Sequence, residues 1–155
     1  MLQKQIIFFA FFLITLSGAS QDLVLENGMY CTTDGEPFTG VKQQFYESGT
    51  LESVYNFKNG LLQEEVITYY PDGSTSEIGF FDQNKRVGTW KTFHSNGTVS
   101  AIASFDDGKK NGAWRIYDQS GLCRLEMFYD QGIKIGHWTL FDEFAQVIDQ
   151  KYFED

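Results

Sequence analysis

The chain has 155 residues and a formal net charge of −9, with 21 acidic against 12 basic residues. Binding to nucleic acid or to anionic membranes depends on clustered lysine and arginine, so this balance disfavours both. It favours a basic partner or simple solubility. Aromatic residues make up 17% of the chain and only two residues are proline, a composition typical of β-sheet and not of disorder.

The first twenty residues have the pattern of a secretory signal peptide. Lys4 precedes an apolar stretch at 6–16, and small residues follow at 17–20. The apolar stretch has 11 residues, whereas a bilayer-spanning helix needs roughly 18 or more. Cleavage near Ala19 or Ser20 is therefore favoured over a retained anchor. Because no lipobox cysteine is present, we expect a secreted or periplasmic mature chain without a lipid anchor.

Residues 21–39 fit no regular pattern and are expected to form an N-terminal cap or partial hairpin. From residue 40 onward the chain is a tandem repeat with a period of 24 residues. The five units span 40–63, 64–87, 88–111, 112–135 and 136–155. The structural repeat positions are Gly40, Gly88, Gly112 and Gly136 at the unit starts, Gly49, Gly97 and Gly121 nine residues later, and Trp90, Trp114 and Trp138 two residues after a start.

Each repeat is predicted to be a β-hairpin. Asp-Gly and Asn-Gly pairs such as Asn96-Gly97 lie between extended segments, and they indicate type I′ turns in which both central residues have positive φ. A glycine or asparagine in each return loop, such as Gly60, suggests positive φ there as well. All connections are then short turns. The sequence predicts an all-β fold, an elongated antiparallel β-hairpin meander built from the 24-residue repeats.

Residue spacing along a strand predicts which side chains share a face. Val99 and Phe105 are six residues apart in the second strand of one repeat, so a regular strand would place both on the same face. Trp90 and Phe93 are three apart in the first strand. Either they point to opposite faces or a β-bulge shifts the register between them.

The repeat resembles a known family at this level of detail. Gly-x-Trp-x-x-Phe/Tyr followed by a polar-Gly turn is similar to the bacterial variant of the MORN repeat. The resemblance covers roughly residues 35–153, and Trp90, Trp114 and Trp138 carry it best. It implies an elongated, non-enzymatic sheet that makes protein or membrane contacts. The entry segment 37–40, Pro-Phe-Thr-Gly, also resembles the start of such arrays in proteins labelled YwqK-type antitoxins, which would imply a toxin partner.

Residues with catalytic or metal-binding chemistry are sparse. His94 and His137 occupy different repeat offsets and lack neighbours at zinc-ligand spacing. The acidic pair Asp106-Asp107 is the one local candidate for calcium, and lysines follow it. We therefore predict no catalytic residues, no cofactor and no metal. Cys31 and Cys123 are separated by more than three repeats, or ~30 Å at two strands per repeat, too far for a disulfide.

The sequence favours a non-enzymatic, exported protein-protein interaction module. Exposed tyrosines favour interfaces, and Tyr46, Tyr55 and Tyr70 cluster in the first two repeats as a possible partner contact. An antitoxin or immunity-like inhibitor of a toxin is one alternative, and a peripheral membrane-associated scaffold is another. Self-association through the edge strands of an open sheet is also expected to be possible.

Overall fold

The computed structural model describes residues 22–154, and the predicted leader at 1–20 lies outside them. Strands are the only regular elements in this part of the chain, and no helix there is long and apolar enough to cross a membrane. The strands are β1 (Val24–Glu26), β2 (Met29–Cys31), β3 (Gly40–Phe45), β4 (Leu51–Lys58), β5 (Leu61–Leu62), β6 (Glu64–Tyr69), β7 (Thr75–Asp82), β8 (Lys85–Phe93), β9 (Val99–Asp106), β10 (Lys109–Lys110), β11 (Gly112–Tyr117), β12 (Cys123–Asp130), β13 (Ile133–Phe141) and β14 (Val147–Phe153).

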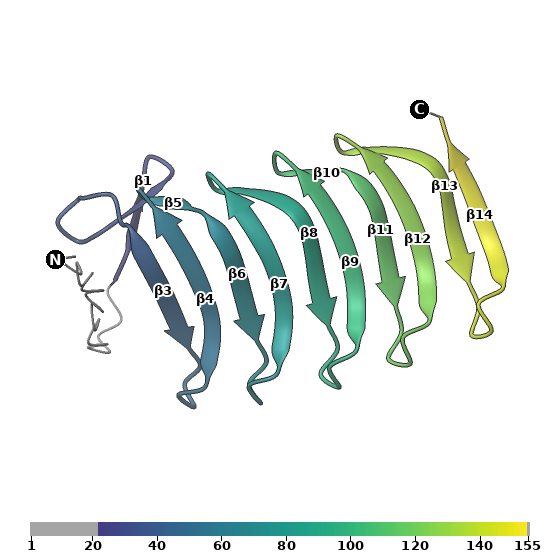
Figure 1. The fold of residues 1–155 in the computed structure, drawn as a ribbon, viewed down its shortest axis with the longest axis horizontal. Coiled ribbons are helices and arrows are strands. Elements are labelled where there is room, and N and C mark those ends of the chain that lie inside the picture. The colour runs from purple at the N-terminus through teal and green to yellow at the C-terminus, as the bar shows by residue number, and fades with distance from the viewer. Residues whose placement is uncertain (1–21, 155) are drawn as a thin grey trace, which may run out of the picture.

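Twelve of these strands form one antiparallel sheet in which neighbours along the chain are neighbours in space. The path runs from β3 at one edge to β14 at the other, and Figure 1 shows it as a row of hairpins. The short strands β5 and β10 pair with β4 and β9. The predicted hairpin meander is therefore confirmed, since each 24-residue repeat contributes one hairpin.

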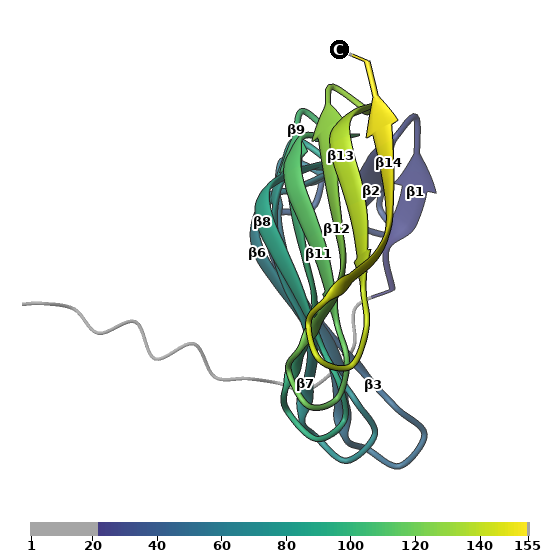
Figure 2. The ribbon, with the colours of Figure 1, turned by 90° about the vertical axis from the view of Figure 1, so that its right-hand side faces the viewer.

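The first hairpin, β1 and β2, forms a separate two-stranded sheet. It lies to one side of the large sheet (Figure 2). The Tyr30 ring stands edge-on to Phe57 at 5.0 Å between centroids, and the Tyr30 backbone N–H donates to the Gly60 carbonyl at 2.7 Å. The N-terminal residues thus pack on a face of the array near β4, without pairing with its edge strand β3.

The turns within the repeats differ from the sequence prediction. In the Asn96-Gly97 turn only Gly97 has positive φ, and the same holds for Asp72-Gly73. A type I′ turn needs positive φ at both central residues, so the prediction of type I′ turns there was wrong. The Asn96 carboxamide oxygen instead accepts the Thr98 backbone N–H at 3.0 Å. This local bond stabilises the turn that leads into the glycine.

The two-residue return loops between repeats do have positive φ at both positions. Asn59 and Gly60 have φ of 51° and 77°, and Asp107 and Gly108 have φ of 47° and 81°. The expectation of positive φ in the return loops is confirmed. Backbone N–H groups of these loops donate to carbonyls of the preceding repeat, for example from Gly108 to Arg86 at 2.9 Å. Successive repeats are thereby joined at one end of the sheet.

A β-bulge recurs at the same place in the hairpin of each repeat. In the third repeat Thr92 pairs with Ala101 but Phe93 pairs with Val99, so one extra residue lies in β9. Equivalent register shifts follow Gln44, Thr68, Ile116 and Leu140. Trp90 and Phe93 accordingly point to opposite faces, since the extra residue lies in β9 and β8 continues regularly from Trp90 to Phe93.

The bulge also corrects the predicted face of the second strand. Val99 pairs with Phe93, whereas Phe105 contacts Trp90 with ring centroids 6.1 Å apart. Val99 and Phe105 therefore lie on opposite faces, and the prediction that they share one was wrong. The extra residue of the bulge breaks the even spacing on which that prediction depended.

The unit starts require a left-handed backbone. Gly88, Gly112 and Gly136 have φ of 65°, 82° and 60°, and Glu64, which replaces glycine in the second repeat, is held at a φ of 66°. A residue with a Cβ in this region costs about 1–3 kcal/mol. We expect Glu64→Gly to raise the free energy of unfolding by about 1 kcal/mol after the greater chain entropy of glycine is subtracted.

Urea denaturation checks this prediction. The matched control is Glu65→Gly in the neighbouring strand position, where the backbone has no positive φ. Glycine there should lower the free energy of unfolding by about 0.5–1 kcal/mol. A destabilised Glu64→Gly variant would show that the left-handed backbone at this start is not strained.

Candidate interaction surface

A ladder of aromatic rings runs across one face of the large sheet, the face that carries Trp90, Trp114 and Trp138, which we call the aromatic face. Each tryptophan packs between rings from the strands on either side. The order is Phe81, Trp90, Phe105, Trp114, Tyr129, Trp138 and Phe153, with successive centroids 4.9–6.1 Å apart. Offset and edge-on contacts at these distances are favourable. The ladder connects the last four hairpins.

Three basic side chains lie over this ladder at 24-residue spacing. The Arg86 guanidinium carbon lies 4.1 Å from the Trp90 ring centroid. The Lys110 and Lys134 ammonium nitrogens lie 4.3 and 4.4 Å from Trp114 and Trp138. These are cation-π contacts, and the charged heads cover ring faces that a single-layer sheet would otherwise expose. The sequence prediction missed this column, although a basic residue two positions before Gly88, Gly112 and Gly136 was its signal.

Trp90 is buried against a glycine of the preceding hairpin. Trp90 pairs with Ala103 and lies against Gly79 of β7, where an added Cβ would be 2.1 Å from the ring. Its side chain is 3% exposed, and its buried indole N–H has no partner among the described residues. Trp114, by contrast, donates its indole N–H to the Ser104 carbonyl at 3.0 Å. The absence of a side chain at Gly79 thus seats Trp90 differently from the other tryptophans.

The ladder is interrupted in the first two repeats, where Lys42 and Val66 stand at the tryptophan position. An open hollow of about 510 Å³ lies on the aromatic face at this interruption. Its lining residues are Asp22, Leu23, Tyr30, Lys42, Gln44, Tyr55, Phe57, Leu62 and Phe81. Rings and aliphatic groups line it together with charged and amide groups, a composition typical of binding sites.

A second, smaller hollow of about 130 Å³ lies on the same face beside Trp90 and Trp114. Its floor includes the small residues Thr92 and Ala101. Glu77 lines it as well, and partial burial raises the pKa of the Glu77 carboxyl, an effect that Arg86 opposes at 3.9 Å. Burial disfavours the charged form of a carboxyl, and a cationic group docked beside Glu77 would favour that form, as Arg86 does.

The three tyrosines predicted as a contact patch lie in two places. The hydroxyl groups of Tyr46 and Tyr70 donate to the carbonyls of Tyr69 and Phe93, at 2.7 and 2.6 Å, and so link each hairpin turn to the next. Tyr55 lies in mid-strand opposite Lys42 and lines the larger hollow. Of the three, Tyr55 belongs to the aromatic face, whereas Tyr46 and Tyr70 join the turns at one end of the sheet.

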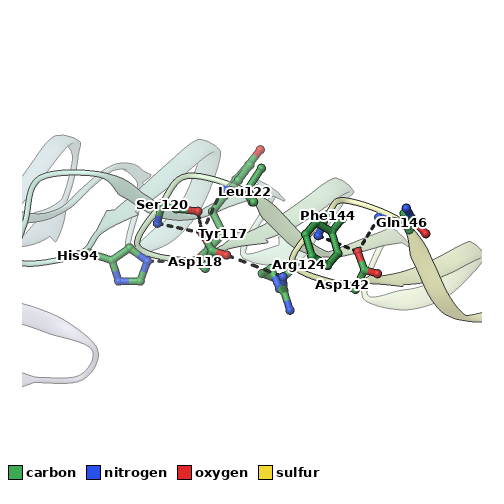
Figure 3. Close-up of polar contacts among 9 residues, drawn as sticks. All are labelled: His94, Tyr117, Asp118, Ser120, Leu122, Arg124, Asp142, Phe144 and Gln146. Carbon is green, nitrogen blue, oxygen red and sulfur yellow. Dashed lines mark hydrogen bonds and ion pairs between the residues drawn. The ribbon is translucent and has the colours of Figure 1, made fainter.

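The side-chain hydrogen bonds that link one turn to the next are not present in every repeat. A ring nitrogen of His94 lies 3.0 Å from the Tyr117 carbonyl and continues the pattern of the tyrosines. At the next two equivalent positions Asp118 and Asp142 instead accept bonds within their own turns, as Figure 3 shows. The hydrogen bonds from Ser120 lower the pKa of Asp118. Among the described residues, the hairpin that begins at Gly112 therefore lacks this side-chain link to the next turn.

Comparison with known proteins identifies the hairpin motif. Two stretches of the chain match the MORN repeat variant. They are residues 38–59 and 86–107, which contain β3 with β4 and β8 with β9. The two matches start 48 residues apart, which is two repeat periods. The matched hairpins therefore follow the same 24-residue period as the hairpins between and after them. The further resemblance to YwqK-type antitoxins has no support from the comparisons and stays a prediction.

None of the curated proteins matches the chain. Among solved structures, a chain in a crystal structure of accessory secretory proteins 1, 2 and 3 from Streptococcus pneumoniae is similar at 17% identity, with a TM-score of 0.37. The match covers 81% of the present chain and 22% of that chain. The present chain thus spans less than a quarter of the length of that protein.

The polar residues considered in the sequence analysis are separated on the repeat array. His94 lies in a turn, whereas His137 lies in β13 with its ring centroid 5.0 Å from that of Tyr152. Asp107 pairs with Lys85. Residues 22–154 contain no group of three or more histidine, cysteine or acidic side chains placed to hold a metal ion. Cys31 and Cys123 are both free thiols.

Proposed function

We propose that this chain is a non-enzymatic, exported interaction module that binds a partner protein on its aromatic face. The observation that carries the proposal is the larger hollow, which opens where Lys42 and Val66 interrupt the tryptophan ladder. A hollow of about 510 Å³ that combines rings with polar groups suits an anchoring side chain of another protein. The match of two hairpins to the MORN repeat variant agrees with this role, because such repeats are commonly protein-interaction modules.

The chemistry of the aromatic face favours one kind of partner segment. Tyr55, Tyr30 and Phe81 offer ring surfaces in the larger hollow, and Glu77 offers a partly buried carboxylate in the smaller one. A partner that inserts an aromatic or long aliphatic side chain and carries a nearby basic residue would use both hollows. The net charge of −9 assists the approach of a basic partner.

Affinity capture tests this proposal. The chain from Gln21 to Asp155 would be used as bait against envelope and secreted fractions of its own organism, and retained proteins would be identified by mass spectrometry. We expect one protein at a stoichiometric level, and we expect Tyr55→Ser to remove it. The control is Phe144→Ser in the last turn, a residue that is 72% exposed and remote from both hollows.

Two results would contradict the proposal. One is a partner that Tyr55→Ser retains as well as Phe144→Ser does, since the hollow would then play no part in binding. The other is the recovery of copies of the chain alone, or of lipid alone. Tyr70→Phe serves as a further control, because it removes the hydroxyl bond between turns without touching the aromatic face.

A further inference from the structure

The last strand, β14, presents an unpaired and apolar edge within the described residues. Its one neighbour in the sheet is β13, and every residue of β14 except Phe153 is exposed. Val147, Ile148 and Tyr152 are 57%, 59% and 58% exposed. An exposed edge strand is a ready template for pairing with another chain.

The residues of β14 are chemically symmetric about Gln150. Two apolar residues, Val147 and Ile148, come before Asp149, and two aromatic residues come after Lys151. If two copies pair antiparallel with Gln150 opposite Gln150, each Asp149 lies opposite Lys151 of the other copy. The bulge after Leu140 puts the extra residue of β14 directly before Asp149, so Ile148 and Val147 do not continue this register. Opposite charges are a stabilising cross-strand combination.

The faces of the sheet agree with this register. Asp149 and Lys151 pair with Leu140 and Trp138 in β13, so both lie on the aromatic face. A two-fold axis perpendicular to the sheet keeps the aromatic faces of both copies on the same side, and the two charges meet there. Such an interface is closed at β14, because each copy uses the same surface and the β14 edge of each copy is then paired.

The other possible pairing between copies places like charges together. In this alternative, β14 pairs with β3 of a second copy in the same register in which β9 pairs with β11, where Ala101 lies opposite Ile116. That register places Lys151 of one copy alongside Lys42 of the other. Like charges directly opposite are destabilising, and head-to-tail pairing would produce open filaments.

We propose that β14 is a homodimer interface, in which two copies pair antiparallel about Gln150 and join their sheets into one continuous sheet. The pairing predicts a specific pattern for charge variants. Asp149→Lys places lysine opposite lysine, and Lys151→Asp places aspartate opposite aspartate, so each variant alone should weaken dimerisation at least about tenfold. A mixture of the two variants restores both opposite-charge pairs and should form a heterodimer.

Sedimentation velocity of the chain from Gln21 to Asp155, which contains every strand of the fold, tests this interface. Matched controls are Asp130→Lys in β12 and Lys91→Asp in β8, which make the same charge changes on strands paired on both sides. We expect dimers for the wild type and both controls, monomers for each β14 variant alone, and dimers for their mixture. Far-ultraviolet circular dichroism of each variant confirms that it is folded.

Three results would overturn the proposal. They are a monomeric wild type at micromolar concentration, a folded single variant that dimerises as well as the wild type, or a mixture of folded variants that stays monomeric. Because partner capture through Tyr55 involves the opposite end of the array, failure of the dimer interface leaves the proposed function intact, and the reverse also holds.

Discussion

Gly79→Ala is expected to lower the free energy of unfolding by about 3 kcal/mol, near the top of the usual range for overpacking. The new methyl group would lie 2.1–2.4 Å from atoms of the Trp90 ring, a distance that no real contact allows. The backbone at Gly79 has no positive φ, so the whole effect comes from the ring. Trp90 can relieve the overlap only by leaving a site where it is 3% exposed. Urea denaturation measures the change.

A double-mutant cycle separates this cause from others. Trp90→Val copies the residue that stands at the tryptophan position in the second repeat, where Val66 is 3% exposed. In a Trp90→Val background, Gly79→Ala should cost less than about 0.5 kcal/mol, since the ring is gone. Equal costs of Gly79→Ala in the two backgrounds would show that the contact with Trp90 is not the reason that glycine is needed.

Trp114→Ala is expected to cost about 3–5 kcal/mol, the usual range for removing a packed aromatic side chain. The Trp114 ring lies 5.1 Å from Phe105 and 5.5 Å from Tyr129, and it carries Lys110 on its face. Its loss would also leave the Ser104 carbonyl without the indole donor. Because repeats stabilise only their neighbours, the hairpins after residue 112 should also unfold before the rest.

Chemical denaturation followed by tryptophan fluorescence checks this prediction, since Trp90 and Trp138 report on either side of the change. Phe144→Ala is the control, because that ring is 72% exposed and its loss should change stability by less than about 0.5 kcal/mol. A Trp114→Ala variant as stable as Phe144→Ala would show that the aromatic ladder covers the sheet without holding it together.

Much of the fold could be predicted from the sequence because the same local features recur in several repeats. The 24-residue period gave the hairpins and their order, and the glycine or asparagine of the return loops gave positive φ at Gly60 and Gly108. Spacing rules failed where a single extra residue intervenes. The bulge beside Phe93 moves Val99 to the face opposite Phe105, and a period of two cannot reveal such a bulge.

The candidate site was harder to predict, because it depends on contacts across strands. Tyr46 and Tyr70 were expected to face a partner, yet each hydroxyl reaches a carbonyl of the next turn. These hydrogen bonds can be recognised only once the arrangement of neighbouring hairpins is known. The larger hollow lies where Lys42 and Val66 stand in place of tryptophan. A sequence motif does not reveal the space that such a replacement leaves open. Tyr55 was predicted as one of three tyrosines clustered in the first two repeats, and the structure places it in the lining of that hollow.

Site-specific photo-crosslinking tests the use of the aromatic face most directly. Benzoylphenylalanine would replace either Tyr55, which lines the larger hollow, or Phe80, which is 43% exposed on the opposite face of β7. Both changes keep an aromatic side chain, and the chain would be irradiated in the presence of the envelope and secreted fractions of its organism. We predict a crosslinked protein from position 55 and none from position 80. Crosslinking from position 80 alone, or from neither position, would contradict binding on the aromatic face.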